Sequence, residues 1–516
     1  MAHSPVAIGR VGGPLAALAV TAPIAAAFAA VLWRGGGAMT LGPSGWAALN
    51  FTVTQAALSA ALSVLIAIPL ARALARRRFP GRALLVTLLG APFILPVIVA
   101  VLGLIAVFGR AGWVSLALQS VGFAPVSIYG LTGVVLAHVF FNLPLATRLI
   151  LHGWDSVPAE RFRLTAQLGL TPVQTFTVLE WPLLCRTVPG AFALIFAVCL
   201  TSFAVALTLG GGPRATTLEL AIYEAFRFEF DLPRAAGLSL IQLALAGAAA
   251  LVALWLAPAM PRAGGMGRAV HRFDAPGGWR RAADSGLITL GAAFLLLPLA
   301  ALVLRGAPAL FSLPSSVWQA AFTSVQIACV STVLMVAIAL PMAGWIASAK
   351  RGGAEALGLL GLAASPLTIG TGWFILLHPW TDPAAWTVPV TALVNAMMAL
   401  PFALRALVPA LRAGIADHGR LAASLGLTGW RYWVSVALPL ARPQLGFAAG
   451  LCAALSIGDL GVVALFAATD QASLPLQMAR LMGAYRMEDA AGAALVLMAL
   501  AFTAFWACDR WGHAAR

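Results

Sequence analysis

Long apolar stretches separated by short polar segments recur along the whole chain. Each stretch is long enough to cross a hydrocarbon core about 30 Å thick, which requires about 20 apolar residues in a helix. They lie at about 14–33, 52–75, 83–108, 127–151, 186–210, 236–258, 284–304, 321–348, 355–377, 387–411, 443–467 and 487–508. Because lipid offers no partner to backbone N–H and C=O groups, spanning segments must be helical. The pattern predicts an all-α membrane protein with about 12 transmembrane helices.

The polar segments divide these windows into two sets of six. A Pro/Gly-rich stretch with five arginines is too polar to cross a membrane, so we interpret 259–285 as a cytoplasmic linker. Residues 1–258 and 286–516 then form two six-helix repeats. Because each repeat has an even number of spans, the two run parallel and are related by an axis along the membrane normal.

Two polar cassettes, at about 155–182 and 412–439, repeat at an interval of 257 residues. Each has an acid, an arginine, a glycine and a proline at the same spacing: Glu160, Arg163, Gly169 and Pro182, then Asp417, Arg420, Gly426 and Pro439. Acid and arginine share one helix face, and each glycine permits a turn. Pro158 can open the first helix, although no proline matches it in the second copy. An amphipathic interfacial helix explains one such loop, but two with equal spacing indicate docking points for a partner outside the membrane.

The charge distribution predicts the topology. Hydrophobic residues make up 61% of the chain and charged residues 9%, against about 25% charged residues in soluble domains. The net charge is +15, and most arginines fall in cytoplasmic segments when the N-terminus is inside, which is the positive-inside bias. We therefore expect cytoplasmic N- and C-termini, with lipid rather than nucleic acid as the partner of this basic chain. The first window follows Arg10 and resembles a signal peptide, but we expect an uncleaved span because no soluble domain follows.

The sequence lacks the motifs of an enzyme. The only lysine, Lys350, is followed by Arg351, which excludes a P-loop. No HExxH, CxxC or GxSxG occurs, and the five cysteines have no paired spacing. We expect no catalytic residue, metal or cofactor on this chain. A proton-driven secondary transporter would need several acids within the spans, whereas the one good candidate is Asp459. Asp459 could pair within the protein or face a cationic substrate.

The two cassettes resemble the coupling loops of permease subunits of ATP-binding cassette (ABC) importers. The matching residues are Gly169, Leu179 and Pro182, then Gly426, Val436, Leu438 and Pro439; Arg163 and Arg420 stand where that family has glutamate. The resemblance implies the type I ABC importer permease fold. It also implies two ABC ATPase subunits, one on each coupling helix, which carry the ATP and Mg²⁺.

Longer strings are similar to the fused permeases of bacterial thiamine ABC transporters. They are Ser202–Tyr223, Leu455–Phe466, Leu474-Pro475 and Gly483–Arg486. This resemblance implies a multi-pass inner-membrane importer that takes thiamine, or its phosphates, from a periplasmic thiamine-binding protein and works by alternating access. A permease for ferric iron or another small solute is the alternative.

The same resemblance suggests where substrate passes. Thiamine carries a permanent thiazolium charge, which aromatic faces and acids can contact. Asp459 is the first candidate, followed by Tyr223, Glu219 and Trp373. Glu219 could instead contact the binding protein, which we expect at the outside segments 211–234 and 469–488.

Overall fold

The computed structural model describes residues 9–35, 42–90, 94–210, 212, 215–256, 278–348, 365–468 and 471–514. The regular secondary structure of this part of the chain is entirely helical, with no strand, which confirms the all-α prediction. Within it, eleven helical segments are long and apolar enough to cross a membrane. The window expected at 355–377 corresponds to the shorter α17 (Pro366–Leu377), since 349–364 lie outside the described residues.

The helices before residue 257 begin and end as follows: α1 (Gly9–Gly35), α2 (Pro43–Arg76), α3 (Arg82–Leu88), α4 (Val97–Phe108), α5 (Trp113–Ser120), α6 (Leu131–Asp155), α7 (Ala159–Gln167), α8 (Pro172–Thr175), η2 (Phe176–Glu180), α9 (Trp181–Leu200), α10 (Ala204–Leu209), α11 (Leu218–Arg227) and α12 (Leu232–Leu256). Those after residue 277 are α13 (Trp279–Gly306), η4 (Pro308–Ser312), α14 (Ser315–Ser348), α17, η5 (Pro383–Trp386), α18 (Thr387–Ser424), α19 (Gly429–Tyr432), η6 (Trp433–Ala437), α20 (Leu438–Ile457), α21 (Gly461–Phe466), α22 (Leu474–Gly483) and α23 (Met487–His513).

The two sets of helices exchange their first members. α1 packs on α14 and α17 of the second set, and α13 packs on α2 and α4 of the first. Glycines allow these close approaches, since a methyl group at Gly13 would lie 2.2 Å from Cβ of Trp345. One at Gly103 would lie 2.6 Å from the carbonyl oxygen of Pro298. Each set is therefore held by a helix of the other.

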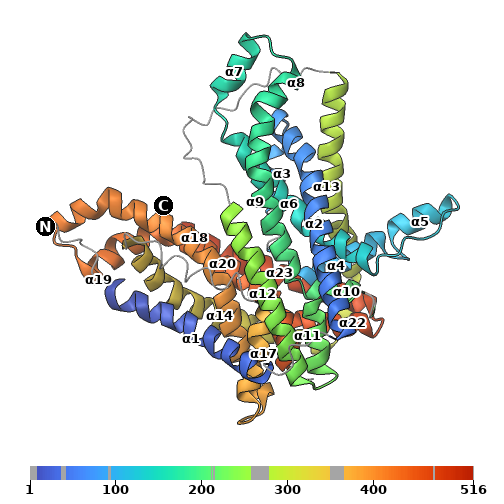
Figure 1. The fold of residues 1–516 in the computed structure, drawn as a ribbon, viewed down its shortest axis with the longest axis vertical. Helices are drawn as coiled ribbons and strands as arrows, with labels where there is room; N and C mark the ends of the chain where they lie inside the picture. Colours follow the sequence, from blue (N-terminus) through green and yellow to red (C-terminus); the bar gives the residue numbers. More distant parts are fainter. Residues whose placement is uncertain are drawn as a thin grey trace.

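The helices form two arms that diverge from a common end (Figure 1). α11 and α17, which contact each other, lie at the common end. α7 and α8 lie at the far end of one arm, and α19 lies at the far end of the other. The two cassettes therefore lie far apart, at the tips of different arms.

Most of the linker predicted at 259–285 lies outside the described residues, which resume at Gly278. In its last part, α13 begins at Trp279, so 279–285 are helical. This first turn of α13 carries no acid, but Asp284, one turn further, pairs with Arg77 just beyond α2 at 2.6 Å. The ion pair connects this polar start of α13 to the end of α2.

Candidate coupling and passage sites

The first cassette forms a short helix separate from the span before it. α6 ends at Asp155, and Pro158 directly precedes α7, where its missing N–H leaves no helical hydrogen bond unmade. Phe162 is buried on one face of α7, whereas Glu160 and Arg163 are exposed. Glu160 lies in the first turn, where the helix dipole favours an acid.

The second cassette lies on a continuous helix. Ile415 stands where the first cassette has Pro158, and its N–H can stay in the helical ladder, so α18 runs unbroken to Ser424. Asp417 and Arg420 are exposed on its last turns. The same charge pattern is therefore carried by the end of a span rather than by a separate helix.

Both cassettes then turn in the same way. Gly169 has φ +65° and Gly426 has φ +70°, in the left-handed region that favours glycine. In each, the residue after the glycine donates its N–H to the carbonyl five residues back, at 3.0 Å and 2.9 Å, as in a Schellman helix end. The π-helical turns η2 and η6 follow, and Pro182 and Pro439 are the second residues of α9 and α20.

Each cassette also exposes apolar side chains at equivalent positions. The pairs are Leu164 and Leu421, Leu168 and Leu425, and Val173 and Trp430. The degree of exposure matches as well, at 65% for Leu168 and 66% for Leu425. Apolar side chains exposed beside charged ones at the tip of each arm form a surface suited to a protein partner.

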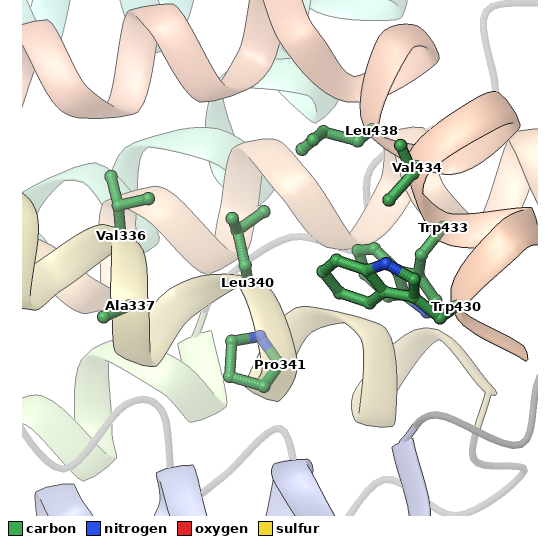
Figure 2. Close-up of a pocket in the computed structure, with 8 residues that line it drawn as sticks. All are labelled: Val336, Ala337, Leu340, Pro341, Trp430, Trp433, Val434 and Leu438. Carbon is green, nitrogen blue, oxygen red and sulfur yellow. The ribbon is translucent and has the colours of Figure 1, made fainter.

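Each cassette packs on a long helix of its own half, α2 in the first half and α14 in the second. The chemistry of the two contacts differs. In the second half, the indole of Trp433 lies against α14 beside Leu340 and Pro341 (Figure 2). A methyl group at Gly344 would lie 2.2 Å from Cζ2 of Trp433, so the ring occupies the space that a side chain there would fill. This junction is apolar.

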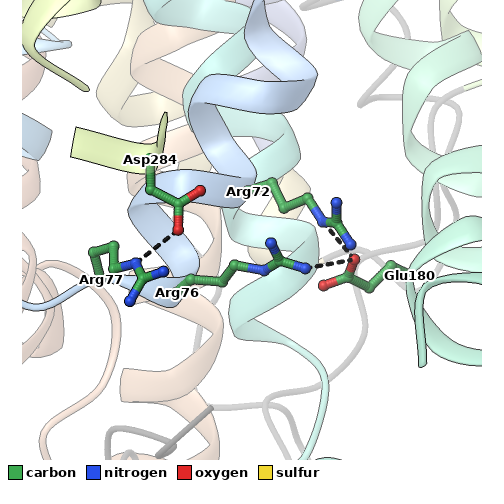
Figure 3. Close-up of polar contacts among 5 residues, drawn as sticks. All are labelled: Arg72, Arg76, Arg77, Glu180 and Asp284. Atoms are coloured by element: carbon green, nitrogen blue, oxygen red, sulfur yellow. Dashed lines mark hydrogen bonds and ion pairs between the residues drawn. The ribbon is translucent and has the colours of Figure 1, made fainter. Parts of the chain in front are cut away.

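In the first half, the same junction is charged. Nε of Arg72 on α2 donates to Oε2 of Glu180 at 2.7 Å, and Nη2 of Arg76 lies 3.9 Å from the same oxygen (Figure 3). The Arg72 guanidinium also stacks on Phe176, 4.6 Å from its ring centre. The Glu180 side chain is completely buried, so it depends on these cations. Sequence reasoning missed Glu180; a lone acid in the apolar run before Trp181 was the available signal.

The Asp459 carboxylate lies between α20 and α21. It is close to the side chain of Asn395 on α18 and to the backbone N–H groups of 461–463, the first turn of α21. Oδ2 of Asp459 and Nδ2 of Asn395 are buried and have no hydrogen-bond partner among the described residues. The carboxylate is thus held on one side by the start of α21. On the other side, polar atoms have no partner among the described residues.

Glu219 and Tyr223 lie on α11, outside the eleven span-length segments. Gln242 donates to Oε1 of Glu219 at 3.0 Å. Burial raises the pKa of Glu219 to about 7, an effect that hydrogen bonds from Ser365 and Gln242 partly offset. Tyr223 packs edge-on against Phe203, with ring centres 5.2 Å apart.

Only some of the four residues predicted to line the passage lie near one another. Phe203, which contacts Tyr223, also lies beside Gly461, 3.7 Å from where a methyl group there would be, so the Asp459 turn and Tyr223 share one aromatic neighbour. Trp373 lies half-buried on α17, and its Nε1–H has no partner within the described ranges. The described residues contain no cluster of three potential metal ligands.

Comparison with known proteins gives full-length similarity. No family model matches the chain. The thiamine transport system permease protein of Brucella abortus (strain 2308) is 38% identical over 517 residues, covering 97% of this chain and 92% of that protein. The protein of the same description from Escherichia coli (strain K12) is 40% identical, covering 90% of this chain and 89% of the relative. That of Haemophilus influenzae is 33% identical, covering 87% and 86%.

Proposed function

The chain belongs to the family of thiamine transport system permease proteins, and on that premise we propose that it forms the membrane passage of an ATP-driven thiamine importer. Similarity along nearly the whole of both chains is the observation that carries the proposal. The ferric-iron alternative has no such support. The apolar helices agree with a multi-pass protein of the inner membrane, and we place both termini in the cytoplasm because of the arginine distribution.

We propose that each cassette binds one ATPase subunit, so that two copies assemble with one chain and bring ATP and Mg²⁺. Two features support this. The cassettes share one turn geometry, and each exposes the same pattern of leucines and charges at the tip of an arm. Closure of the two ATPases would draw the tips together and open the common end. Hydrolysis would let the arms diverge again, with ligand binding shifting the balance between two states.

We propose that thiamine, or one of its phosphates, enters from a periplasmic binding protein at the common end and passes Asp459. The Asp459 carboxylate supplies a negative charge for a cationic ring, and the Asn395 side chain lies beside it. Tyr223, Glu219 and Trp373 are further passage residues. Arg227 and Arg480 lie close to Tyr223, so the surroundings of Tyr223 are positive. Asp459 is therefore the better contact for the thiazolium cation.

The test is uptake of labelled thiamine into proteoliposomes that contain the chain, its ATPase and the cognate binding protein. We expect uptake that requires ATP and the binding protein and that unlabelled thiamine, but not ferric iron, inhibits. Asp459→Asn should lower this uptake while the protein stays folded; Ser202→Ala, at the equivalent position of the first half, is the matched control. ATP-dependent activity without thiamine uptake would contradict the substrate, and normal uptake by Asp459→Asn would remove its role.

Docking is tested by co-purification of the ATPase. Leu168→Glu with Leu425→Glu should abolish co-purification, because both residues are exposed and the change places a charge in each apolar surface. Phe311→Glu, also at an exposed apolar residue but in η4, should not. ATPase retention by the double variant would contradict the coupling assignment.

A further inference from the structure

An apolar cavity lies between α14 and the second cassette. Its volume is about 250 Å³, and its lining is entirely hydrophobic: Val336, Ala337, Leu340, Pro341, Trp430, Trp433, Val434 and Leu438. Figure 2 shows the two indoles at one end and Val336 and Ala337 at the other. An apolar cavity of about 150 Å³ already suffices to bind benzene, so this one has room for part of a hydrocarbon chain.

The cavity is adjacent to a surface suited to lipid. α14 contains no charged residue along its length. Its exposed residues include Trp318, Phe322 and Val333, which lie on one side of the helix, and Ala337 continues this side to the cavity wall. A span that is apolar and exposed on one side faces hydrocarbon in a membrane. An acyl chain can therefore reach the cavity along α14.

The cassette end of the cavity has the composition of a lipid-headgroup region. Trp430 and Trp433 form this end of the cavity. Arg431, between the two tryptophans in sequence, is exposed. Tryptophan and arginine together are typical of the depth of lipid headgroups.

We propose that the cavity binds an acyl chain of an anionic glycerophospholipid. The acyl chain fills the cavity between α14 and the two indoles, and the phosphate lies toward Arg431. The apolar cavity and the exposed cation then follow the order of hydrocarbon and negative charge along a lipid. The site does not depend on what is transported. Trp430, which lines it, also belongs to the exposed apolar surface of the second cassette, so the lipid borders the surface proposed for the ATPase.

The experiment measures lipid retained by the purified full chain, using native mass spectrometry after exchange into detergent. We expect one phospholipid per wild-type chain. Leu340→Trp fills the cavity and should lower retention at least about tenfold, the loss expected when about two methylene groups lose their contacts. Ile68→Trp, at the equivalent position on α2, is the control and should retain the lipid. Equal retention by the wild type and Leu340→Trp would overturn the site.

Two milder variants keep the proposal testable if Leu340→Trp does not fold. Trp433→Phe replaces the indole in the cavity wall by a smaller ring that makes fewer contacts with the acyl chain, and should weaken retention. Arg431→Gln should abolish a preference for phosphatidylglycerol over phosphatidylethanolamine when both are supplied. Unchanged retention and preference in these two variants would overturn the proposal, as would recovery of a free fatty acid in place of a phospholipid.

Discussion

The two junctions between cassette and neighbouring span have the same backbone geometry but opposite chemistry. In the first half, Arg72 stacks on Phe176 and pairs with the buried Glu180. In the second half, Trp433 replaces the phenylalanine and fills the space above Gly344. The π-helical turn is retained in both. A fixed backbone arrangement can thus be stabilised either by charge pairing or by aromatic packing, with different sensitivities to mutation.

The helices leading into the cassettes differ as well. The first cassette follows a break at Pro158, whereas α18 continues through Ile415. A break lets α7 change its direction relative to α6, while a continuous helix moves as one body with its span. The two cassettes therefore present similar surfaces on supports of different stiffness.

The largest effect is expected from removing the cations of the first junction. Arg72→Met with Arg76→Met removes two cations that contact the buried Glu180 carboxylate. Loss of one side of a buried ion pair costs about 3–5 kcal/mol. We expect a correspondingly lower midpoint in thermal unfolding of the purified chain.

Adding Glu180→Leu to this double variant should restore most of the lost stability. All three charges are then replaced by apolar groups, and such replacements are often neutral. If the triple variant is no more stable than the double, the charges do more than neutralise one another. Apolar packing then cannot replace charge pairing at the first junction.

The next largest effect is a pH dependence of stability that we expect from α11 but not from its counterpart α22. Glu219 is a buried acid on α11, whereas Pro475 occupies the equivalent place on α22. The pKa of Glu219 is about 7 in the folded chain, above its ordinary value of 4.5. The folded state then binds a proton that the unfolded state releases, so stability falls as pH rises from about 4.5 to 7 and is level above.

Glu219→Gln should remove this contribution. A pKa difference of this size corresponds to about 3 kcal/mol, lost on raising the pH through that window. Thermal unfolding at pH 5 and pH 8 measures it, with Glu488→Gln, an exposed acid at the start of α23, as control. An identical pH dependence in Glu219→Gln and the wild type would show that Glu219 is not the group responsible.

A smaller effect is expected at the apolar junction. Gly344→Ala would place a methyl group 2.2 Å from Cζ2 of Trp433, so the ring must move. Such overpacking costs about 1–3 kcal/mol. Gly344→Ala with Trp433→Leu should be close to wild-type stability in thermal unfolding, because the smaller side chain frees the space. A single variant as stable as the wild type would show that the indole can shift freely.

The sequence was sufficient to predict the helices, because spanning segments depend on local apolar length. It also located turns at Gly169 and Gly426, since glycine is favoured wherever φ is positive. It did not locate the Arg72–Glu180 pair, whose members lie 108 residues apart and meet only through packing. Nor did it show that α18 is unbroken or that the first helices are exchanged, because both depend on contacts between distant helices.

The smallest effects are expected where the two halves are most alike. Gly169 and Gly426 have φ values of +65° and +70°, and a methyl group at either would meet no atom within 4 Å. Alanine at each therefore costs only the strain of the left-handed conformation, about 1 kcal/mol. Thermal unfolding of Gly169→Ala and Gly426→Ala should show equal small shifts, because neither contact nor charge contributes. Unequal shifts would mean that the break at Pro158, rather than the turn itself, decides how much strain the first cassette can absorb.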